Sequence, residues 1–340
     1  MRVRARAAKA VAGAAGALAM AASLSGCITV HGETAVVPAA SQSGAERAVQ
    51  RYLDTMNEVS VSFDAEQVGP TMTGPLAEIT EASLTALHGI NPDGNPDPEA
   101  ATVEFTRTEV FIPEQAGWPK FFVAEVTLSD DDGGAHWLLV FTRNSIDERW
   151  KAAYRAILPP DEVPELEVDD NGYLVDIPLD DGAAGLAVPP AELSTAYAGT
   201  LDGDGALNGD GYLQSGEGPF ASGPYTDQLL AERETEPAPE EDWQYRDWAA
   251  NEPEHAPVAM RTADGSALVF FTSHHSDRQT VAPGHTPSVS EEVEQLMEGE
   301  ARTSVTRTWL SMQLALVPAE GEGDVEILRR HPGIIEARGE

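Results

Sequence analysis

Leu138-Leu139-Val140-Phe141-Thr142 is an apolar run that recurs later in the chain as Leu268-Val269-Phe270-Phe271-Thr272. Ahead of it, Phe122-Val123-Ala124 is echoed by Pro257-Val258-Ala259. Short apolar runs bounded by polar residues are typical of buried strands. Two matches in the same order predict an internal duplication in this 340-residue chain. Such a repeat determines how the rest of the sequence is interpreted.

A second repeated motif precedes each of these strands. Gly69-Pro70-Thr71-Met72-Thr73-Gly74-Pro75 recurs as Gly218-Pro219-Phe220-Ala221-Ser222-Gly223-Pro224. In each copy an acidic residue, Glu78 or Asp227, follows the second proline by three positions. Proline fits the first turn of a helix, and an acid there opposes the positive end of the helix dipole. Each copy therefore predicts the start of a helix.

The first repeat has the order of an α+β unit. Apolar residues at three- and four-residue steps predict a helix over 45–59, and a second helix is expected over 75–87. A proline-rich loop over 91–98 follows. Alternating or continuous apolar residues then predict strands at 121–128, 136–143 and 150–156. Helices followed by a run of antiparallel strands are typical of the α+β class.

The second repeat shows a similar order with one long insert. A helix carrying Leu193, Ala196 and Tyr197 and another after Pro224 precede strands expected at 256–262, 267–273, 303–317 and 325–329. Trp150 follows Thr142 by 8 residues, whereas Trp309 follows Thr272 by 37. The resulting insert, 274–302, includes a short predicted helix near 290–297. Long inserts are usually functional or disordered, so we expect a partner-binding surface there.

Two stretches of low periodicity separate these units. Residues 27–44 are small and polar and predict a flexible tether. Residues 159–190 are acidic and contain prolines, which indicates a linker with one strand near 173–177. The expected organisation is therefore a segment 1–26, a tether 27–44, a first repeat 45–158, a linker 159–190 and a second repeat 191–340.

The N-terminus carries an export signal. Four basic residues and no acidic ones precede a short apolar run, 10–24, which is below the roughly 20 residues that span a bilayer. No Arg-Arg pair is present, which argues against the twin-arginine route. The run ends in Leu24-Ser25-Gly26-Cys27, and Cys27 is the only cysteine of the chain.

Leu24-Ser25-Gly26-Cys27 resembles the lipobox of bacterial lipoproteins. The resemblance implies that the Cys27 thiol receives a diacylglycerol, and palmitate with it, and that residues 1–26 are removed. Two acyl chains are enough for stable anchoring. We therefore expect a protein on the extracytoplasmic face of the cell membrane, whose partner is the outer leaflet of the cytoplasmic membrane. The alternative is a buried structural cysteine that happens to follow an export signal.

Charge and cysteine content exclude several classes of function. The chain has 21 Lys and Arg against 57 Asp and Glu, and after the signal 17 basic residues face 57 acidic ones, a net charge of −40. Nucleic-acid binding depends on cations that neutralise phosphates, so no nucleic-acid partner is expected. Net repulsion from anionic lipid predicts that the anchor holds the membrane without a basic patch. With Cys27 acylated, disulfides, thiolate zinc sites and cysteine nucleophiles are excluded.

The element order resembles the cone-shaped fold of nuclear transport factor 2-like proteins, which ketosteroid isomerases share. In that fold helices pack inside a curved antiparallel sheet and leave a pocket. A lipobox followed by two such units is similar to uncharacterised lipoproteins of high-GC Gram-positive bacteria, particularly filamentous actinobacteria. The resemblance implies two tandem cone-like repeats. It carries over no catalytic residue, because no matching catalytic motif stands in this sequence.

Two clusters have the residue types of a metal site. The segment 201–211 alternates acidic residues and glycine, which suits a hard cation such as calcium, but it lacks the EF-hand's fifth, sixth and twelfth positions. We interpret it as an acidic turn, with calcium as the alternative. The second cluster lies around 274–285 and matches no zinc spacing, so a polar loop is favoured over zinc. The candidate ligands are Asp202, Asp204, Asn208 and Asp210 for calcium, and His274, His275, Asp277 and His285 for zinc.

No catalytic constellation is visible in the sequence. A nucleophile elbow, a phosphate loop and a His-Glu-x-x-His motif are all missing. We therefore expect a non-catalytic binding or protein-interaction module whose partner is an envelope protein. The alternative is an enzyme or carrier acting on a small hydrophobic molecule held in a cone pocket. A sealed apolar interior would favour the first, and an open pocket with converging carboxylates or histidines the second.

Overall fold

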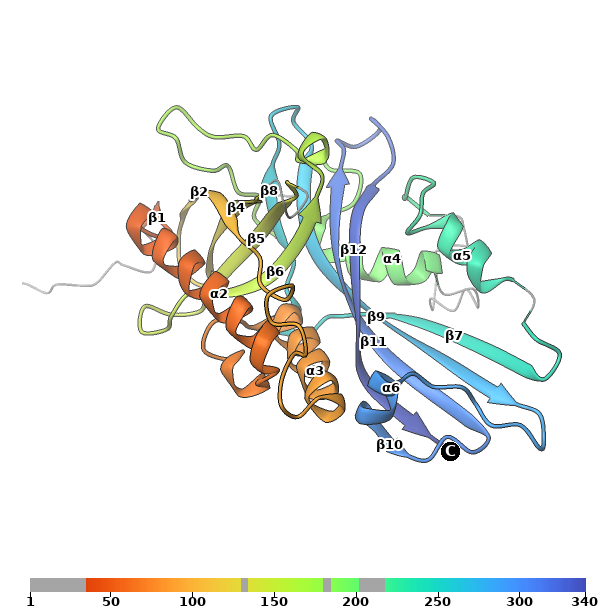
Figure 1. The fold of residues 1–340 in the computed structure, drawn as a ribbon. Helices are drawn as coiled ribbons and strands as arrows, with labels where there is room; N and C mark the ends of the chain where they lie inside the picture. Colours follow the sequence, from red (N-terminus) through yellow and green to blue (C-terminus); the bar gives the residue numbers. More distant parts are fainter. Residues whose placement is uncertain (1–34, 130–133, 180–184, 202–217, 236) are drawn as a thin grey trace, which may run out of the picture.

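The described chain folds into two large, mostly antiparallel sheets with helices packed between and around them (Figure 1). A computed structural model describes residues 35–129, 134–179, 185–201, 218–235 and 237–340. The first sheet has the strand order β2-β4-β5-β6. The helices and strands of this half of the chain are α2 (Gln42–Ser62), α3 (Gly74–Ile90), β2 (Phe105–Phe111), β4 (Lys120–Leu128), β5 (His136–Arg143) and β6 (Lys151–Leu158).

Helix α2 begins and ends at clear capping signals. The Ser41 hydroxyl accepts a hydrogen bond from the Gly44 N–H at 3.2 Å, as an N-cap residue should. At the other end Phe63 takes a left-handed conformation with φ 54°, and its N–H bonds to the Val59 carbonyl. Just before the helix, β1 (Val37–Pro38) pairs with β3 (Glu114–Gln115). The last part of the predicted tether is therefore packed structure and not a free chain.

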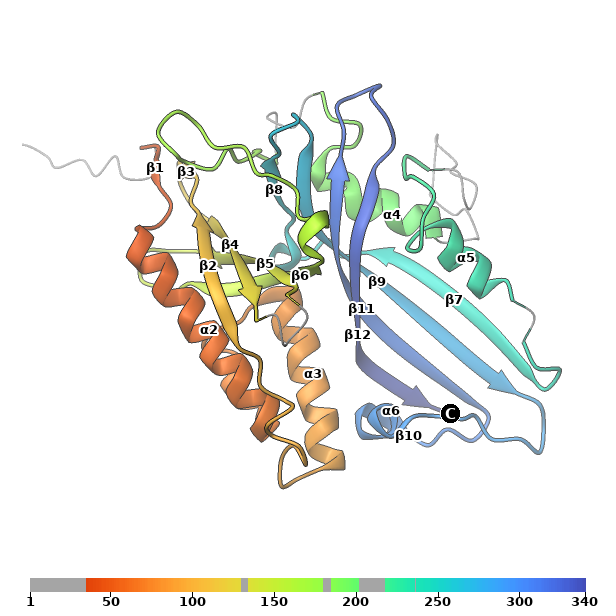
Figure 2. The same ribbon diagram turned by 45° about the horizontal axis from the view of Figure 1, so that its top comes forward.

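Helix α3 lies between the two sheets (Figure 2). Pro75 occupies its first turn, so the helix start predicted from the Gly-Pro motif is confirmed. Helix α3 also packs against β12 (Glu326–Gly339), where a Cβ added to Gly333 would overlap the Ile79 side chain. A glycine is needed at this position because the strand backbone approaches the helix so closely.

The second sheet has the order β10-β12-β11-β9-β7, with the short strand β8 also paired to β9. Strands β10 and β12 run parallel, and the other pairs are antiparallel. Strands expected near 256–262, 267–273 and 303–317 are present. The remaining elements are η5 (Pro190–Glu192), α4 (Leu193–Leu201), α5 (Asp227–Arg233), β7 (Glu241–Ala249), η6 (Pro253–His255), β8 (Val258–Arg261), β9 (Ala267–Val281), α6 (Glu291–Leu296), β10 (Met297–Gly299) and β11 (Ser304–Val317).

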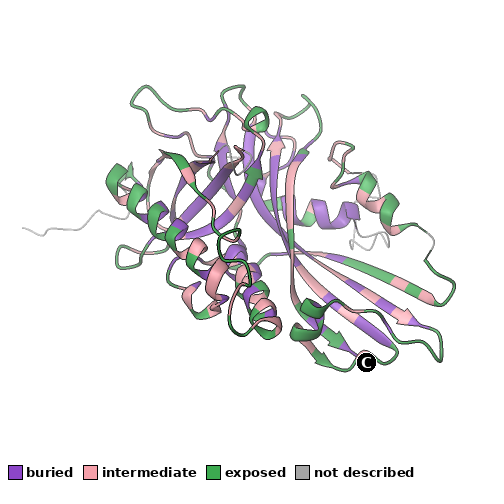
Figure 3. Ribbon diagram, viewed as in Figure 1, coloured by how far each residue is buried: buried purple, intermediate pink, exposed green. Residues whose placement is uncertain are grey.

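The long strand β9 is buried on both of its faces over residues 267–274, and burial alternates only beyond them (Figure 3). Leu268 and Phe270 face the first sheet and join a core that contains residues of both halves. Val269 and Phe271 face the opposite way and pack under α4 in a second core. The α+β class predicted from the sequence is confirmed, and the two sheets share one continuous apolar interior.

Two predicted boundaries differ from the structure. In the expected linker, Leu174, Ile177 and Leu186 are buried, and the backbone of Ile177 bonds to Ala259, so this segment packs along the body. In the expected insert, residues 274–281 continue strand β9 between β7 and β11. The predicted loop at His274 is therefore wrong, while the short helix predicted near 290–297 is present as α6.

One of the repeated motifs occupies comparable positions in the two halves. Val123 pairs with Val140, and Val258 pairs with Phe270, so the matched hairpins share one register. The Gly-Pro motifs do not correspond in the same way: Met72 bridges to Ala152 in β6, next to β5, whereas Phe220 bridges to Val325 before β12, which is separated from β9 by β11. The duplication and the cone-like repeats therefore stay predictions. Among the described residues, no helix is long and apolar enough to cross a membrane.

Candidate functional site

The predicted lipidation motif, Leu24 to Cys27, lies outside the described residues, as do the calcium candidates Asp202, Asp204, Asn208 and Asp210. Both stay predictions from the sequence. The described chain begins at residue 35, just before β1 and the N-terminus of α2. The predicted attachment point therefore precedes the first described residue by eight positions.

The four residues of the predicted zinc cluster do not converge. His274 and His275 are neighbours on β9, so their side chains point to opposite faces of the sheet. Asp277 is on the His275 face and is already bound by Arg307 and by the Trp309 indole N–H. His285 lies in an exposed turn beyond the end of β9. The structure therefore separates His274 from the other three.

His275 is held by packing and by a neighbouring cation. Its ring stacks on Trp309 with centroids 5.4 Å apart, and its Nδ1 lies 3.0 Å from an Arg330 nitrogen. Burial first, and then the charges of Arg330 and Arg233, lower the pKa of His275 to about 2. The imidazole is therefore neutral and accepts a hydrogen bond from Arg330.

His274 instead belongs to a cluster built from three separate elements. Glu252 precedes η6, His255 ends it, and Glu78 is the fifth residue of α3. The His255 Nε2 is 2.7 Å from the Glu78 Oε1, and its Nδ1 is 3.3 Å from the Glu252 Oε2. The same Glu252 oxygen is 3.9 Å from the His274 Nε2. One ligand atom from each of Glu252, His255 and His274 lies within 4.8 Å of the other two.

Close backbone packing fixes the cluster in place. Gly74, at the start of α3, has φ +54°, and a Cβ on it would lie 2.5 Å from the Glu254 carbonyl oxygen. The Tyr154 hydroxyl, on β6, donates to the carbonyls of His255 at 3.0 Å and Ala256 at 2.9 Å. The first half of the chain thus holds η6 from two sides.

The two histidines have opposite electrostatic environments. Burial works against the charged form of His255, but the hydrogen bond and charge of Glu78, together with Glu252, outweigh it and raise its pKa. Burial lowers the pKa of His274, and Glu252 offsets this only in part. A hydrogen bond from its own backbone N–H to its carboxylate, and then the nearby histidines, lower the pKa of Glu252. At neutral pH the cluster therefore holds one neutral and one more basic imidazole beside two carboxylates.

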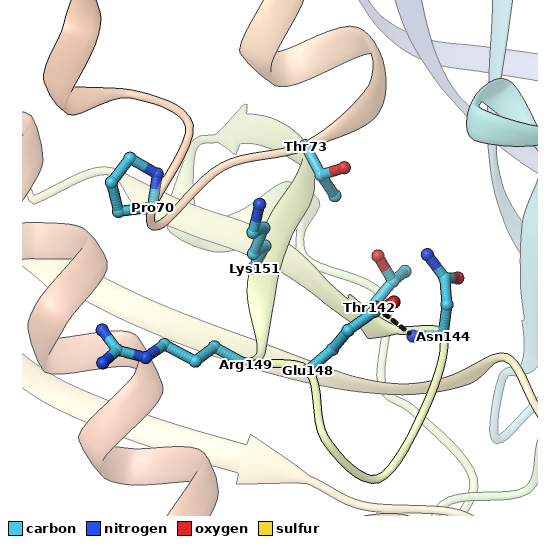
Figure 4. A pocket seen from close by; sticks show the side chains of 7 residues that line it. All are labelled: Pro70, Thr73, Thr142, Asn144, Glu148, Arg149 and Lys151. Carbon is cyan, nitrogen blue, oxygen red and sulfur yellow. Dashed lines mark hydrogen bonds between the residues drawn. The ribbon is translucent and has the colours of Figure 1, made fainter.

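A second feature is an open depression of about 550 Å³ between the Gly-Pro loop before α3 and the turn from β5 to β6 (Figure 4). Lys151 points toward Pro70 and Thr73, while Arg149 extends to the side (Figure 4). Six of the seven lining residues have polar or charged side chains: the lining comprises Pro70, Thr73, Thr142, Asn144, Glu148, Arg149 and Lys151.

Cations gather beside this depression. Loss of hydration first, and then the charges of Arg149 and Arg47, lower the pKa of Arg51. Among the described residues, none of Arg47, Arg51, Arg149 and Lys151 forms an ion pair. This grouping of cations stands out in a chain with a large excess of acidic residues. Cations held close together despite their mutual repulsion are typical of sites that bind anions.

Aromatic side chains fill the interior between α2 and the first sheet. Phe122 and Phe141 stack at 4.8 Å, and Tyr52 meets Phe141 edge-on at 5.9 Å. All three are fully buried. The space that a cone pocket would occupy in this half is therefore taken up by packed rings.

Sequence reasoning missed most of these residues. Glu78 was singled out only as the acid of a helix start, and Glu252 and His255 were not noted, although Glu252-x-x-His255 is a local spacing that brings both side chains to one side of a turn. The cations beside the depression were also missed, because the chain as a whole is strongly acidic and these residues come from two distant segments, α2 and the β5–β6 turn. These groups become neighbours only through the fold.

Comparisons with known proteins found a family model and relatives that match most of this chain. The family model described as the domain of unknown function DUF8094 matches residues 36–339. An uncharacterised lipoprotein of Streptomyces coelicolor is 39% identical over 318 residues, covering 93% of this chain and 91% of the relative. One from Streptomyces avermitilis is 39% identical over 332 residues, covering 96% and 94%. A further S. coelicolor lipoprotein is 25% identical over 288 residues, covering 84% and 79%. No solved structure matches significantly.

Proposed function

This chain belongs to the DUF8094 family, and from that premise we propose that it is a lipid-anchored extracytoplasmic protein that acts as a non-catalytic binding module for a phosphate-bearing partner. Relatives named as lipoproteins and the Leu24-Ser25-Gly26-Cys27 motif support the anchor. The filled interior of the first half favours a surface site over a cone pocket.

The observation that carries the binding role is the unpaired cations beside an open polar depression. The chain has 57 acidic and 21 basic residues, so cations should easily find carboxylate partners. Arg47, Arg51, Arg149 and Lys151 nevertheless form no ion pair among the described residues. Arginine and lysine are the side chains that phosphate oxygens attract most strongly. The depression offers hydroxyl and amide groups of Thr73, Thr142 and Asn144 around them.

The anchor is tested first and separately. Cells fed labelled palmitate should incorporate it into the wild-type chain and not into the Cys27→Ser variant. Label that never enters the wild type, or that persists after Cys27→Ser, would overturn the proposed anchoring. Neither outcome affects the binding test, which uses a chain without lipid.

The binding test uses mature Cys27→Ser chain, residues 27–340, with two probes: glycerol phosphate in solution and vesicles containing phosphatidylglycerol. We expect binding that weakens as salt rises and is lost in the double variant R149Q/K151Q. The matched control is Arg302→Gln, which removes a cation that is 75% exposed and paired with Glu300 at another site. Binding to vesicles alone would identify a membrane headgroup, and binding to both probes a phosphate group in general. Equal loss in the control, or binding of neither probe, would contradict the proposal.

A further inference from the structure

Glu252, His255 and His274 surround a space that fits one metal ion. We propose that the chain binds a divalent transition-metal ion there, zinc by the chemistry of its donors, with the Glu252 carboxylate and one imidazole nitrogen from each histidine as ligands. Glu78 binds the other nitrogen of His255, Nε2, and is not itself a ligand. This inference is independent of the proposed binding of phosphate groups, because the two sites share no residue.

The separations from the Glu252 oxygen are close to those between two ligands of one metal ion. Zinc binds imidazole nitrogen and carboxylate oxygen at about 2.0–2.2 Å, so two ligands of a tetrahedral ion lie roughly 3.3–3.5 Å apart. The Glu252 Oε2 is 3.3 Å from the His255 Nδ1 and 3.9 Å from the His274 Nε2. The second separation is too long for a hydrogen bond. Small side-chain rotations would bring all three atoms onto one ion.

Glu78 supplies the outer partner that zinc-binding histidines usually have. Its Oε1 accepts a hydrogen bond from the His255 Nε2 at 2.7 Å. This bond places the proton on Nε2 and turns the lone pair of Nδ1 toward Glu252. A carboxylate that fixes the tautomer of a ligand histidine in this way is a recurring feature of metal sites.

His274 is a buried ring whose two nitrogens have different surroundings. The residue is only 8% exposed, and its Nδ1 is buried with no hydrogen-bond partner among the described residues. The proposed ligand is the other nitrogen, Nε2, which faces the Glu252 carboxylate at 3.9 Å. Stacking on Trp248, with centroids 5.2 Å apart and planes at 10°, holds the ring in this orientation. A metal ion at Nε2 would fix the tautomer that carries its proton on Nδ1.

The site is reachable from solvent. The side chains of Glu252 and Glu78 are 51% and 41% exposed, whereas that of His255 is only 3% exposed. An ion can therefore enter past the carboxylates and meet the histidines behind them. Three protein ligands leave a fourth position for water or for a ligand atom from a partner. The negative charge of the whole chain raises the local concentration of cations.

The test uses the mature lipoprotein in detergent, purified without a polyhistidine tag and stripped with a chelator. Cobalt(II) serves as a spectroscopic probe for zinc. We expect about one equivalent to bind with visible absorption typical of tetrahedral coordination, and zinc to displace it. Glu252→Gln and His274→Gln should each abolish the absorption. Glu78→Gln should keep the stoichiometry and weaken affinity about 10- to 100-fold.

His285→Gln is the matched control, because it removes an exposed histidine in the turn beyond the end of β9, outside the cluster. It should bind cobalt like the wild type. Glu252→Gln changes an exposed side chain and should fold normally, so it keeps the test decisive if His274→Gln does not fold. Cobalt binding that survives Glu252→Gln, or no binding at micromolar metal in the wild type, would overturn the proposal and leave the cluster as a hydrogen-bond network.

Discussion

His331 on β12 shows how a single buried group ties stability to pH. It pairs with Met312 on β11 and is half-buried. Burial, and then the charge of Arg155, lower the pKa of His331 to about 4. The unfolded value is about 6.5. Because the folded pKa is depressed, the unfolded chain binds the proton first as the pH falls, so the stabilisation is complete above pH 6.5 and is lost toward pH 4.

We therefore predict that His331→Gln weakens the pH dependence of folding. On going from pH 7 to pH 5, His331 should lower the free energy of unfolding of the wild type by about 2 kcal/mol. The His331→Gln variant should not show this part of the decrease. Urea unfolding at the two pH values measures the difference. His88→Gln, at an exposed position of α3, is the control and should follow the wild type. Equal pH dependence in all three proteins would contradict the assigned role of His331.

Tyr154 connects the two halves through one hydroxyl. The group donates to the carbonyls of His255 and Ala256 and accepts from the Thr272 hydroxyl at 3.3 Å. Tyr154→Phe leaves these buried groups without their partner, which should cost about 1–3 kcal/mol. Chemical denaturation of the mature chain gives the value, and stripped protein should be used so that bound metal does not contribute.

The control for Tyr154 is an equally buried tyrosine. The Tyr52 hydroxyl has no hydrogen-bond partner among the described residues. Burial raises its pKa, and the nearby charge of Arg155 offsets this only in part. Tyr52→Phe should therefore change stability by less than Tyr154→Phe does. If the order were reversed, the contacts of the Tyr154 hydroxyl with η6 would not be important for the fold.

At the scale of elements, the start of α3 and η6 form one unit. Gly74 has a positive φ, and a side chain there would strike the Glu254 carbonyl. Gly74→Ala should cost about 2–4 kcal/mol, combining backbone strain with displacement of η6. Metal binding should fall in parallel, because His255 moves with η6. Thermal unfolding and cobalt titration measure the two effects.

Gly265→Ala separates strain from the clash. Gly265 also has a positive φ, +91°, but no atom lies within 4 Å of its added Cβ. This variant should lose only the stability that left-handed backbone costs a side chain, about 1 kcal/mol. It should keep full metal binding. Similar losses in both variants would show that contact with Glu254 does not position η6.

Elements with a strong pattern could be predicted, and exposed edges could not. Helices α2 and α3 and strands β4, β5 and β11 follow apolar periodicity closely, so their positions agree with the sequence. Strands β2 and β7 were missed because both lie at sheet edges and carry runs of exposed side chains, such as those around Glu109 and Tyr245. The polar half of β9 was missed for a different reason: its pairing with β7 and β11 forms only in the fold.

At the scale of the molecule, the shared core predicts a single unfolding transition. One apolar cluster joins Leu268 and Phe270 to residues of the first half, and Tyr154 meets Phe270 at 5.7 Å. The segment predicted as a linker adds buried contacts with both sheets. Calorimetry of the mature chain should therefore give one peak whose calorimetric and van't Hoff enthalpies agree. Two separated peaks would show that the halves fold as independent domains.

Net charge sets how this single unit responds to salt. From residue 27 onward the chain has 17 basic and 57 acidic residues, and this excess of negative charge repels itself more strongly in the compact state. The Debye length falls from about 30 Å at 0.01 M salt to about 3 Å at 1 M. We expect sodium chloride to raise the free energy of unfolding by about 1 kcal/mol, or about 2–4 °C in Tm. Potassium chloride should do the same at equal ionic strength, since screening does not depend on the ion. A rise seen only with sulfate would instead indicate ion exclusion from the surface and would contradict charge repulsion as the cause.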